Sequence, residues 1–238
     1  MRLTSDYHTH TAFSHGKGSV SDNVEAAVKR GLTVVGIADH SVAHFAYGIK
    51  EKQLRDYISC IEQVKREYEG RIDVKTGIEA NLIGLDGSVD IPKQYGFDIV
   101  IMGYHKAVIY KGIKPAWTFF TGKRFGHAAD ITKAYMLAIQ KNHIDIVSHP
   151  GYGVPVDYRM LGRACADYGT LFEINNKHEG LTAQDIKEAA SEGASFVLSS
   201  EAHMPQDVGN VTRALLLSEA AGVVAKVVNL ESPERKAF

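Results

Sequence analysis

The sequence predicts an α/β fold, a distorted seven-stranded TIM-like (β/α)7 barrel, on two observations. Apolar strand-like runs alternate with amphipathic helical segments along the whole chain, as expected for a parallel sheet with right-handed crossovers. Histidines and glutamates follow at least six of these runs, and the loops after barrel strands build the active face. An open, doubly wound sheet would instead concentrate its site at one switch point.

The expected elements follow in order from hydrophobic spacing and from helix start and stop residues. The strands are apolar runs close to residues 4–9, 34–38, 72–78, 99–104, 144–148, 170–175 and 196–200. The helices have apolar residues at helical spacing close to residues 22–30, 52–69, 128–142, 157–168, 182–192 and 211–222. Asp22 and Glu25 stand in capping spacing at the first helix, which Gly31 ends. Gly193 ends the fifth helix in the same way.

The connection at residues 106–127 is the longest in the chain. It interleaves Trp117, Phe119 and Phe120 with lysines and an arginine. Loops of this length inside compact domains are usually functional or disordered. We expect a lid or a contact within a homo-oligomer here.

Composition suits one globular enzyme. The chain has 238 residues, 45% of them hydrophobic and 23% charged, which fits a single barrel domain spanning residues 1–238. The formal net charge of −1 gives no global case for a nucleic-acid or membrane partner, and only local patches could bind polyanions. The chain start lacks an apolar signal core, and no run approaches about 18 apolar residues. We therefore expect a cytoplasmic protein in which Cys60 and Cys165 are free thiols.

Nine residues at strand ends form a candidate metal site. In His8-Thr9-His10, residues two apart on a strand point to the same face, so both imidazoles can approach one cation. The nine are His8, His10, His15, His40, Glu79, His105, His149, Glu201 and His203. Nine donors exceed what one ion or most two-ion sites take, so three ions sharing a bridging carboxylate fit better. Imidazole-rich, thiolate-free ligands suit zinc, manganese, iron, cobalt or nickel more than calcium or magnesium.

These residues resemble the motifs of the PHP (polymerase and histidinol phosphatase) metal-dependent phosphoesterases. The motifs are His8-x-His10, Asp39-His40, Glu79, His105, His149-Pro150 and Glu201-x-His203, so that the resemblance runs from residue 8 to residue 203. It implies a distorted seven-stranded barrel with three divalent transition-metal ions, such as zinc, manganese or iron. It also implies a ligand set for each ion: His8, His10, Glu79 and Glu201; Glu79, His105 and His149; and His15, His40 and His203. Glu201 stands where the family usually has aspartate.

The resemblance and the chemistry of clustered cations together predict a phosphoesterase that acts on small phosphomonoesters. Such cations clamp the nonbridging oxygens of a phosphate dianion and lower the pKa of a bridging water. Histidinol phosphate is one candidate substrate. The expected catalytic residues are Glu79, Asp39 and His203. The residues expected to contact the substrate follow the later strands and are Arg159, Lys177, Asn175 and His178.

Two other functions stay open at this point. An amidohydrolase-type metal hydrolase shares the barrel and the H-x-H motif, but it commonly bridges its metals with a modified lysine at the fourth strand. Here that strand ends in Gly103-Tyr104-His105, which disfavours it. A non-catalytic or proofreading PHP domain would predict missing ligands or fused polymerase regions, and the sequence has neither.

Overall fold

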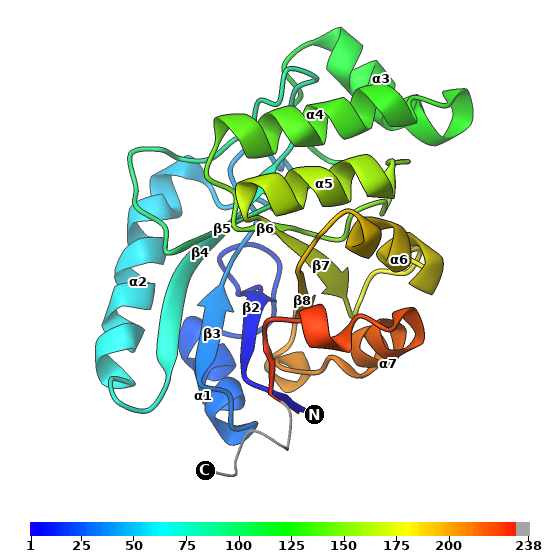
Figure 1. The fold of residues 1–238 in the computed structure, drawn as a ribbon. Helices are drawn as coiled ribbons and strands as arrows, with labels where there is room; N and C mark the ends of the chain where they lie inside the picture. The colour runs from blue at the N-terminus through cyan, green and yellow to red at the C-terminus, as the bar shows by residue number, and fades with distance from the viewer. Residues whose placement is uncertain (232–238) are drawn as a thin grey trace.

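Seven parallel strands curve into a nearly closed barrel in the computed structural model, which describes residues 1–231 (Figure 1). They are β2 (Ser5–Thr9), β3 (Val34–Ile37), β4 (Asp73–Asn81), β5 (Ile99–Gly103), β6 (Ile146–Val147), β7 (Leu171–Asn175) and β8 (Phe196–Ser199). Their order in the sheet is their order in the chain. The first and last strands meet where the His10 amide donates to the Ala202 carbonyl at 2.8 Å. The predicted fold class is confirmed.

The helices cover the outside of this sheet (Figure 1). They are α1 (Val20–Lys29), α2 (Leu54–Glu67), α3 (Ile113–Phe125), α4 (Ala128–Lys141), α5 (Tyr158–Tyr168), α6 (Ala183–Ser191) and α7 (Thr212–Ala221), with short 3-10 turns η1 (Glu51–Gln53), η2 (Pro205–Asp207) and η3 (Val224–Lys226). The expected start of α1 at Asp22 is wrong. The helix begins at Val20, because Ser19 caps it and Asp22 completes the capping box.

The connection 106–127 holds an element that hydrophobic spacing did not predict. Residues 113–125 form α3, which Figure 1 shows beyond α4, on the side away from the strands. Its inner face is anchored by Phe119, whose ring stacks near Tyr104 and Tyr110 with centroids 5.8 and 5.4 Å away. None of the described helices is long and apolar enough to cross a membrane.

Two further short strands join the ends of the described chain. β1 (Arg2–Leu3) pairs antiparallel with β9 (Leu230–Glu231), outside the barrel.

β4 is longer than expected and runs on to Asn81, because Glu79 pairs with Ile101 and Asn81 pairs with Gly103 on β5. Glu79 and Asn81 therefore lie two apart within one strand, on the same face.

Candidate metal centre

Glu79 is the central acid of the site. Its carboxylate is fully buried, and five histidine side chains surround it. Oε1 faces His8 Nε2 at 3.3 Å, and His105 Nε2 and His149 Nε2 at 3.1 Å each. Oε2 faces His40 Nδ1 at 2.7 Å and His10 Nε2 at 3.7 Å. One carboxylate whose two oxygens face different histidines has the arrangement of a bridging ligand.

Partners behind the histidines fix which ring nitrogen faces Glu79. His8 donates its Nδ1–H to Glu173 Oε1 at 2.8 Å, and His105 donates its Nδ1–H to Asn81 Oδ1 at 2.7 Å. Both rings thereby turn Nε2 toward Glu79. Such partners orient imidazole ligands in metal sites and raise their basicity.

Against the effect of burial, neighbouring charges raise the pKa of His8 and lower the pKa of Glu79. Burial disfavours the charged imidazole of His8, but the nearby Glu79 and Glu173 carboxylates outweigh burial and raise the pKa of His8. Burial alone would raise the pKa of Glu79, yet the surrounding imidazoles of His105, His8 and His40 hold it well below its usual range. The acid at the centre is therefore an anion in the folded protein.

His15 and His203 form a second group beside the first. Their Nε2 atoms lie 2.6 Å apart, and the His203 ring lies 4.4 Å from the His10 ring, measured between centroids. Burial and neighbouring positive charge lower the pKa of His15 to about 3 and that of His203 to about 4. Both imidazoles are neutral near pH 7, which is the form that binds a metal ion.

Several buried nitrogen and oxygen atoms in this cluster have no hydrogen-bond partner among residues 1–231. They are His8 Nε2, both ring nitrogens of His10, His15 Nδ1, His40 Nδ1, Glu79 Oε2 and His149 Nδ1. Buried polar atoms without partners are costly and uncommon in folded proteins. His40 Nδ1 and Glu79 Oε2 lie close together and still fail to form a hydrogen bond. This donor set fits transition-metal ions, which would use these lone pairs.

The backbone is strained where two candidate ligands lie. His149 and Glu201 have positive φ angles of 29° and 51°. Residues other than glycine rarely adopt this region of the backbone angles. Gly103 allows His149 to approach β5, because a Cβ there would lie 2.8 Å from His149 Cε1 and 2.3 Å from Ser148 Oγ. Strain of this kind is typical of functional sites.

The longer arm of Glu201 reaches partners that an aspartate would miss. Its Oε1 lies 2.7 Å from His178 Nε2, and its Oε2 accepts a hydrogen bond from Asn175 Nδ2 at 2.6 Å. The ligand atoms of His149, His178 and Glu201 lie within 4.8 Å of one another. His178 thus lies with the candidate ligands and also lines the cavity beside them.

A cavity of about 240 Å³ opens above the cluster. Five candidate ligands face it, namely His15, His40, His105, Glu201 and His203. Its rim carries Lys106 and Lys177. Tyr152 stacks on His178 with ring centroids 3.8 Å apart, and Tyr47 stacks on His15 at 4.5 Å. Sequence spacing did not single out either tyrosine.

The residues expected to contact substrate separate into two sets. Lys177 lines the cavity, with Nζ 2.7 Å from His203 Nδ1, and His178 lines it too. Asn175 points inward and donates to Glu173 and Glu201. Arg159 is turned the other way, toward Glu192 on the outside of the barrel, at 3.5 Å. We therefore do not propose Arg159 as a phosphate contact.

Asp39 lies behind the cluster. Its carboxylate accepts hydrogen bonds from the Thr11 amide and hydroxyl and from the Ser14 hydroxyl. Burial raises the pKa of Asp39 to about 6 despite these donors. Asp39 was expected to be catalytic, but its partners Thr11 and Ser14 belong to the loop that carries His15, so its contacts are those of a positioning residue.

Glu173 is a buried acid of the site that sequence reasoning missed. It is fully buried on β7, and it accepts hydrogen bonds from His8 Nδ1 at 2.8 Å and from the His149 amide at 2.6 Å. A signal was present in the sequence, since an acid between Phe172 and Ile174 interrupts an apolar strand. Glu173 lies on the same strand face as Asn175, which points into the site.

We expect Glu173→Gln to weaken metal binding by about 10–100-fold, the usual loss when a carboxylate behind a histidine ligand is changed. The neutral amide can no longer polarise His8 as an anion does. Chelator competition followed by elemental analysis measures the effect, and Glu192→Gln on the outside of the barrel is the matched control. Equal metal retention by the two variants would remove Glu173 from the site.

Comparison with known proteins adds three findings. The PHP domain family model matches residues 6–178. A protein named probable phosphatase from Thermoanaerobacter sp. (strain X514) is 29% identical over 248 residues, covering 96% of this chain and 90% of that protein. Another of that name, from Shewanella sp. (strain ANA-3), is 30% identical over 237 residues, covering 92% of this chain and 84% of that protein.

A solved structure shares the fold. The histidinol phosphate phosphatase of Lactococcus lactis subsp. lactis Il1403, crystallised with zinc, L-histidinol and phosphate, matches with a TM-score of 0.66 at 18% sequence identity. The match covers 92% of this chain and 94% of that one.

Proposed function

The chain belongs to the PHP domain family, and on that premise we propose that it is a metal-dependent phosphatase that hydrolyses small phosphomonoesters. The observation that carries the proposal is the Glu79 carboxylate, buried among five histidines with unpartnered ring nitrogens beside it. The relatives named as phosphatases align over nearly the whole chain. The zinc, L-histidinol and phosphate of the Lactococcus lactis enzyme make histidinol phosphate one substrate to test.

We assign the nine donors to three ion positions, the first two of which share Glu79. The first would be held by His8, His10, Glu79 and Glu201, the second by Glu79, His105 and His149, and the third by His15, His40 and His203. Three observations support this division. The ligand atoms of His8, His10 and Glu79 lie within 4.8 Å of one another. Glu79 Oε1 faces both His105 and His149 at 3.1 Å. His15 Nε2 lies 2.6 Å from His203 Nε2, and the His15 ring stacks on the His40 ring with centroids 5.0 Å apart.

The chain's own residues prepare the reaction in three ways. Lys106 and Lys177 place positive charge at the cavity rim, where a phosphate dianion enters. Glu173, Asn81 and Asp39 hold the histidines and their loops in place before substrate arrives, so that little reorganisation accompanies the reaction. Bound transition-metal ions would supply charge stabilisation and an activated water.

The small cavity and its aromatic rim favour a compact leaving group. A volume of about 240 Å³ admits a phosphate with a small organic group and excludes a folded macromolecule. The amidohydrolase alternative has no support at β5, where Gly103 stands in place of a bridging lysine and Glu79 on β4 is the central acid.

We expect more than two transition-metal equivalents per chain in protein purified without chelators, because nine donors serve about three ions. The same sample should release phosphate from a panel of phosphomonoesters, histidinol phosphate included, and release should stop after metal removal and return on reloading. Elemental analysis and phosphate assay check both points. Full loading with a single ion would contradict the three-ion assignment, and a fully loaded sample that releases no phosphate would contradict the phosphatase.

A further inference from the structure

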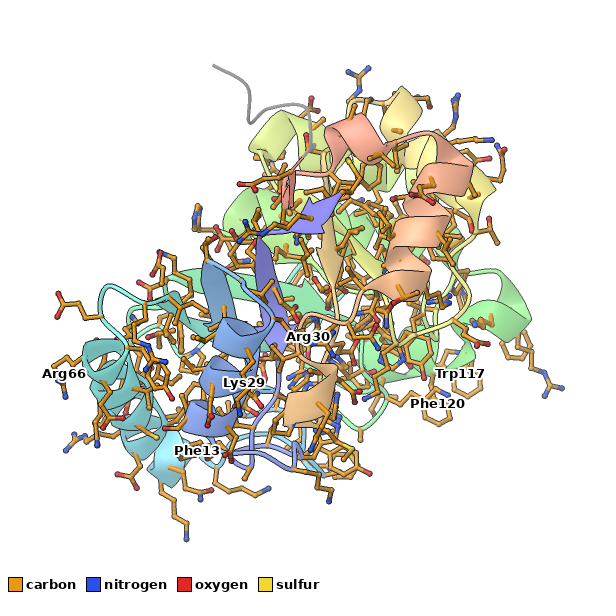
Figure 2. All side chains as sticks on the ribbon, turned by 90° about the horizontal axis from the view of Figure 1, so that it is seen from below. Phe13, Lys29, Arg30, Arg66, Trp117 and Phe120 are labelled. Carbon is orange, nitrogen blue, oxygen red and sulfur yellow. The ribbon has the colours of Figure 1, made fainter. Side chains whose placement is uncertain are left out.

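The helix α3 has two apolar faces. Its inner face, with Thr118, Phe119 and Gly122, is buried. Its outward residues Ile113 and Phe120 are 89% and 73% exposed, and Trp117 between them is 60% exposed. Spacings of four and three residues put these side chains in one stripe. Figure 2 shows Trp117 and Phe120 at the outer edge of the molecule. A surface helix normally turns polar residues to solvent, so this outward stripe needs an explanation.

Positive charge surrounds the stripe. Residues 99–129 contain five cationic residues and no aspartate or glutamate, although the whole chain has a formal net charge of −1. Lys111 pairs with Asp86. Lys114, Lys123 and Arg124 are exposed and make no ion pair within residues 1–231. The whole chain is close to neutral, but the outward surface of α3 is locally basic and apolar.

Two loops beside the cavity also have exposed apolar side chains. Phe45 follows β3 and is 62% exposed, and Ile109 follows β5 and is 65% exposed. The Phe45 amide donates to the Ala107 carbonyl at 3.0 Å, and the Ile109 amide donates to the Ala43 carbonyl at 2.9 Å. These bonds join the loops beside the cavity. We call Phe45, Ile109 and the outward residues of α3 the rim patch.

We propose that the rim patch docks the protein onto an anionic lipid surface. The stripe of Ile113, Trp117 and Phe120 would enter the headgroup boundary, and the flanking Lys114, Lys123 and Arg124 would meet lipid phosphates. Basic helices with exposed aromatic residues bind membrane interfaces in this way. Docking would bring the mouth of the site close to the lipid headgroups.

Charge and shape favour a lipid surface over other occupants. A second copy related by two-fold symmetry would bring the cations of one α3 close to those of the other. A single-stranded nucleic acid would use aromatic rings as stacking platforms, whereas Ile113, the most exposed of the three, offers no ring. The outward helix is convex and gives no groove for a peptide, but it fits a deformable bilayer surface.

Trp117 is the only tryptophan in the chain, so its emission reports directly on the rim patch. The metal-loaded full chain is titrated with phosphatidylcholine vesicles, with and without phosphatidylglycerol, and co-sedimentation is measured in parallel. We expect a blue shift and sedimentation only with the anionic vesicles, weakened by added salt. Phosphatidylglycerol has no phosphomonoester, so binding to it does not depend on turnover.

Matched variants separate charge from apolar contact. Lys114→Gln with Lys123→Gln should lower partitioning by roughly 25-fold, since each cation near an anionic surface contributes roughly fivefold. Lys52→Gln with Lys187→Gln, two exposed lysines outside the patch, should leave it unchanged. Phe120→Ser keeps the Trp117 signal and should cost roughly tenfold, whereas Tyr168→Ser, which removes an exposed ring elsewhere, should cost nothing.

Three outcomes would overturn the proposal. The first is no sedimentation with anionic vesicles by chain that is folded and hydrolyses phosphomonoesters. The second is a blue shift that grows with protein concentration without vesicles, together with a larger sedimentation coefficient, which would assign the patch to a second copy. The third is quenching of Trp117 by a single-stranded oligonucleotide without vesicle binding, which would assign it to nucleic acid.

Discussion

Glu79→Gln should abolish phosphatase activity, with a loss in kcat/KM of at least about 10³-fold, roughly 4 kcal/mol of barrier. The substitution keeps the shape of the side chain and removes only its charge. Both oxygens of Glu79 face imidazoles, so a neutral amide would leave two neighbouring cations underligated and mutually repulsive. Elemental analysis after gel filtration should therefore show metal lost from two positions.

The controls separate the loss of a ligand from the loss of the fold. Glu67→Gln, at the exposed end of α2, should match the wild type in metal content and turnover. His44→Ala removes a cavity-lining imidazole that stacks on His40 with centroids 4.9 Å apart, and it should cost less than Glu79→Gln. Similar, modest losses for Glu79→Gln and His44→Ala would contradict the bridge, provided circular dichroism shows both variants folded.

Hydrophobic periodicity was sufficient to predict the barrel, because most of its strands contain apolar runs and its outer helices have one apolar face. The two omissions have physical causes. In α3 the apolar residues Trp117 and Phe120 face outward while Phe119 faces inward, so the helix shows no single apolar face to recognise. β1 and β9 are two-residue strands at opposite ends of the described chain, and their pairing leaves no local pattern.

The candidate ligands could be found from the sequence because parallel strands end at one rim, whatever their order in the chain. The residues that hold these ligands in place were harder to predict. Asn81 and Glu173 lie within strands and look like structural residues until their side chains meet His105 and His8. Arg159 was expected to contact the substrate, but its side chain does not face the cavity. It follows a strand in sequence, but α5 turns it toward Glu192 and away from the cavity, and helix orientation depends on packing that spacing does not reveal.

Glu201→Asp should retain metal and keep phosphatase activity within about tenfold, roughly 1.4 kcal/mol of barrier. Aspartate tolerates the left-handed backbone better than most residues, and Glu201 has a φ of 51°. The arm becomes shorter by about 1.5 Å, so the contact with His178 Nε2 at 2.7 Å is lost while the negative charge remains. Elemental analysis and the kinetics of phosphate release measure both effects.

Glu201→Gln keeps the length of the arm and removes the charge, so the two variants test reach and charge separately. We expect metal to be lost from the first position and activity to fall by at least about 10²-fold, roughly 2.7 kcal/mol. A neutral amide leaves the net positive charge of the site uncompensated, and rotation of the side chain cannot restore an anion. If Glu201→Gln kept full metal and wild-type turnover while Glu201→Asp lost activity, Glu201 would act by holding His178. The site would then need fewer ions than three.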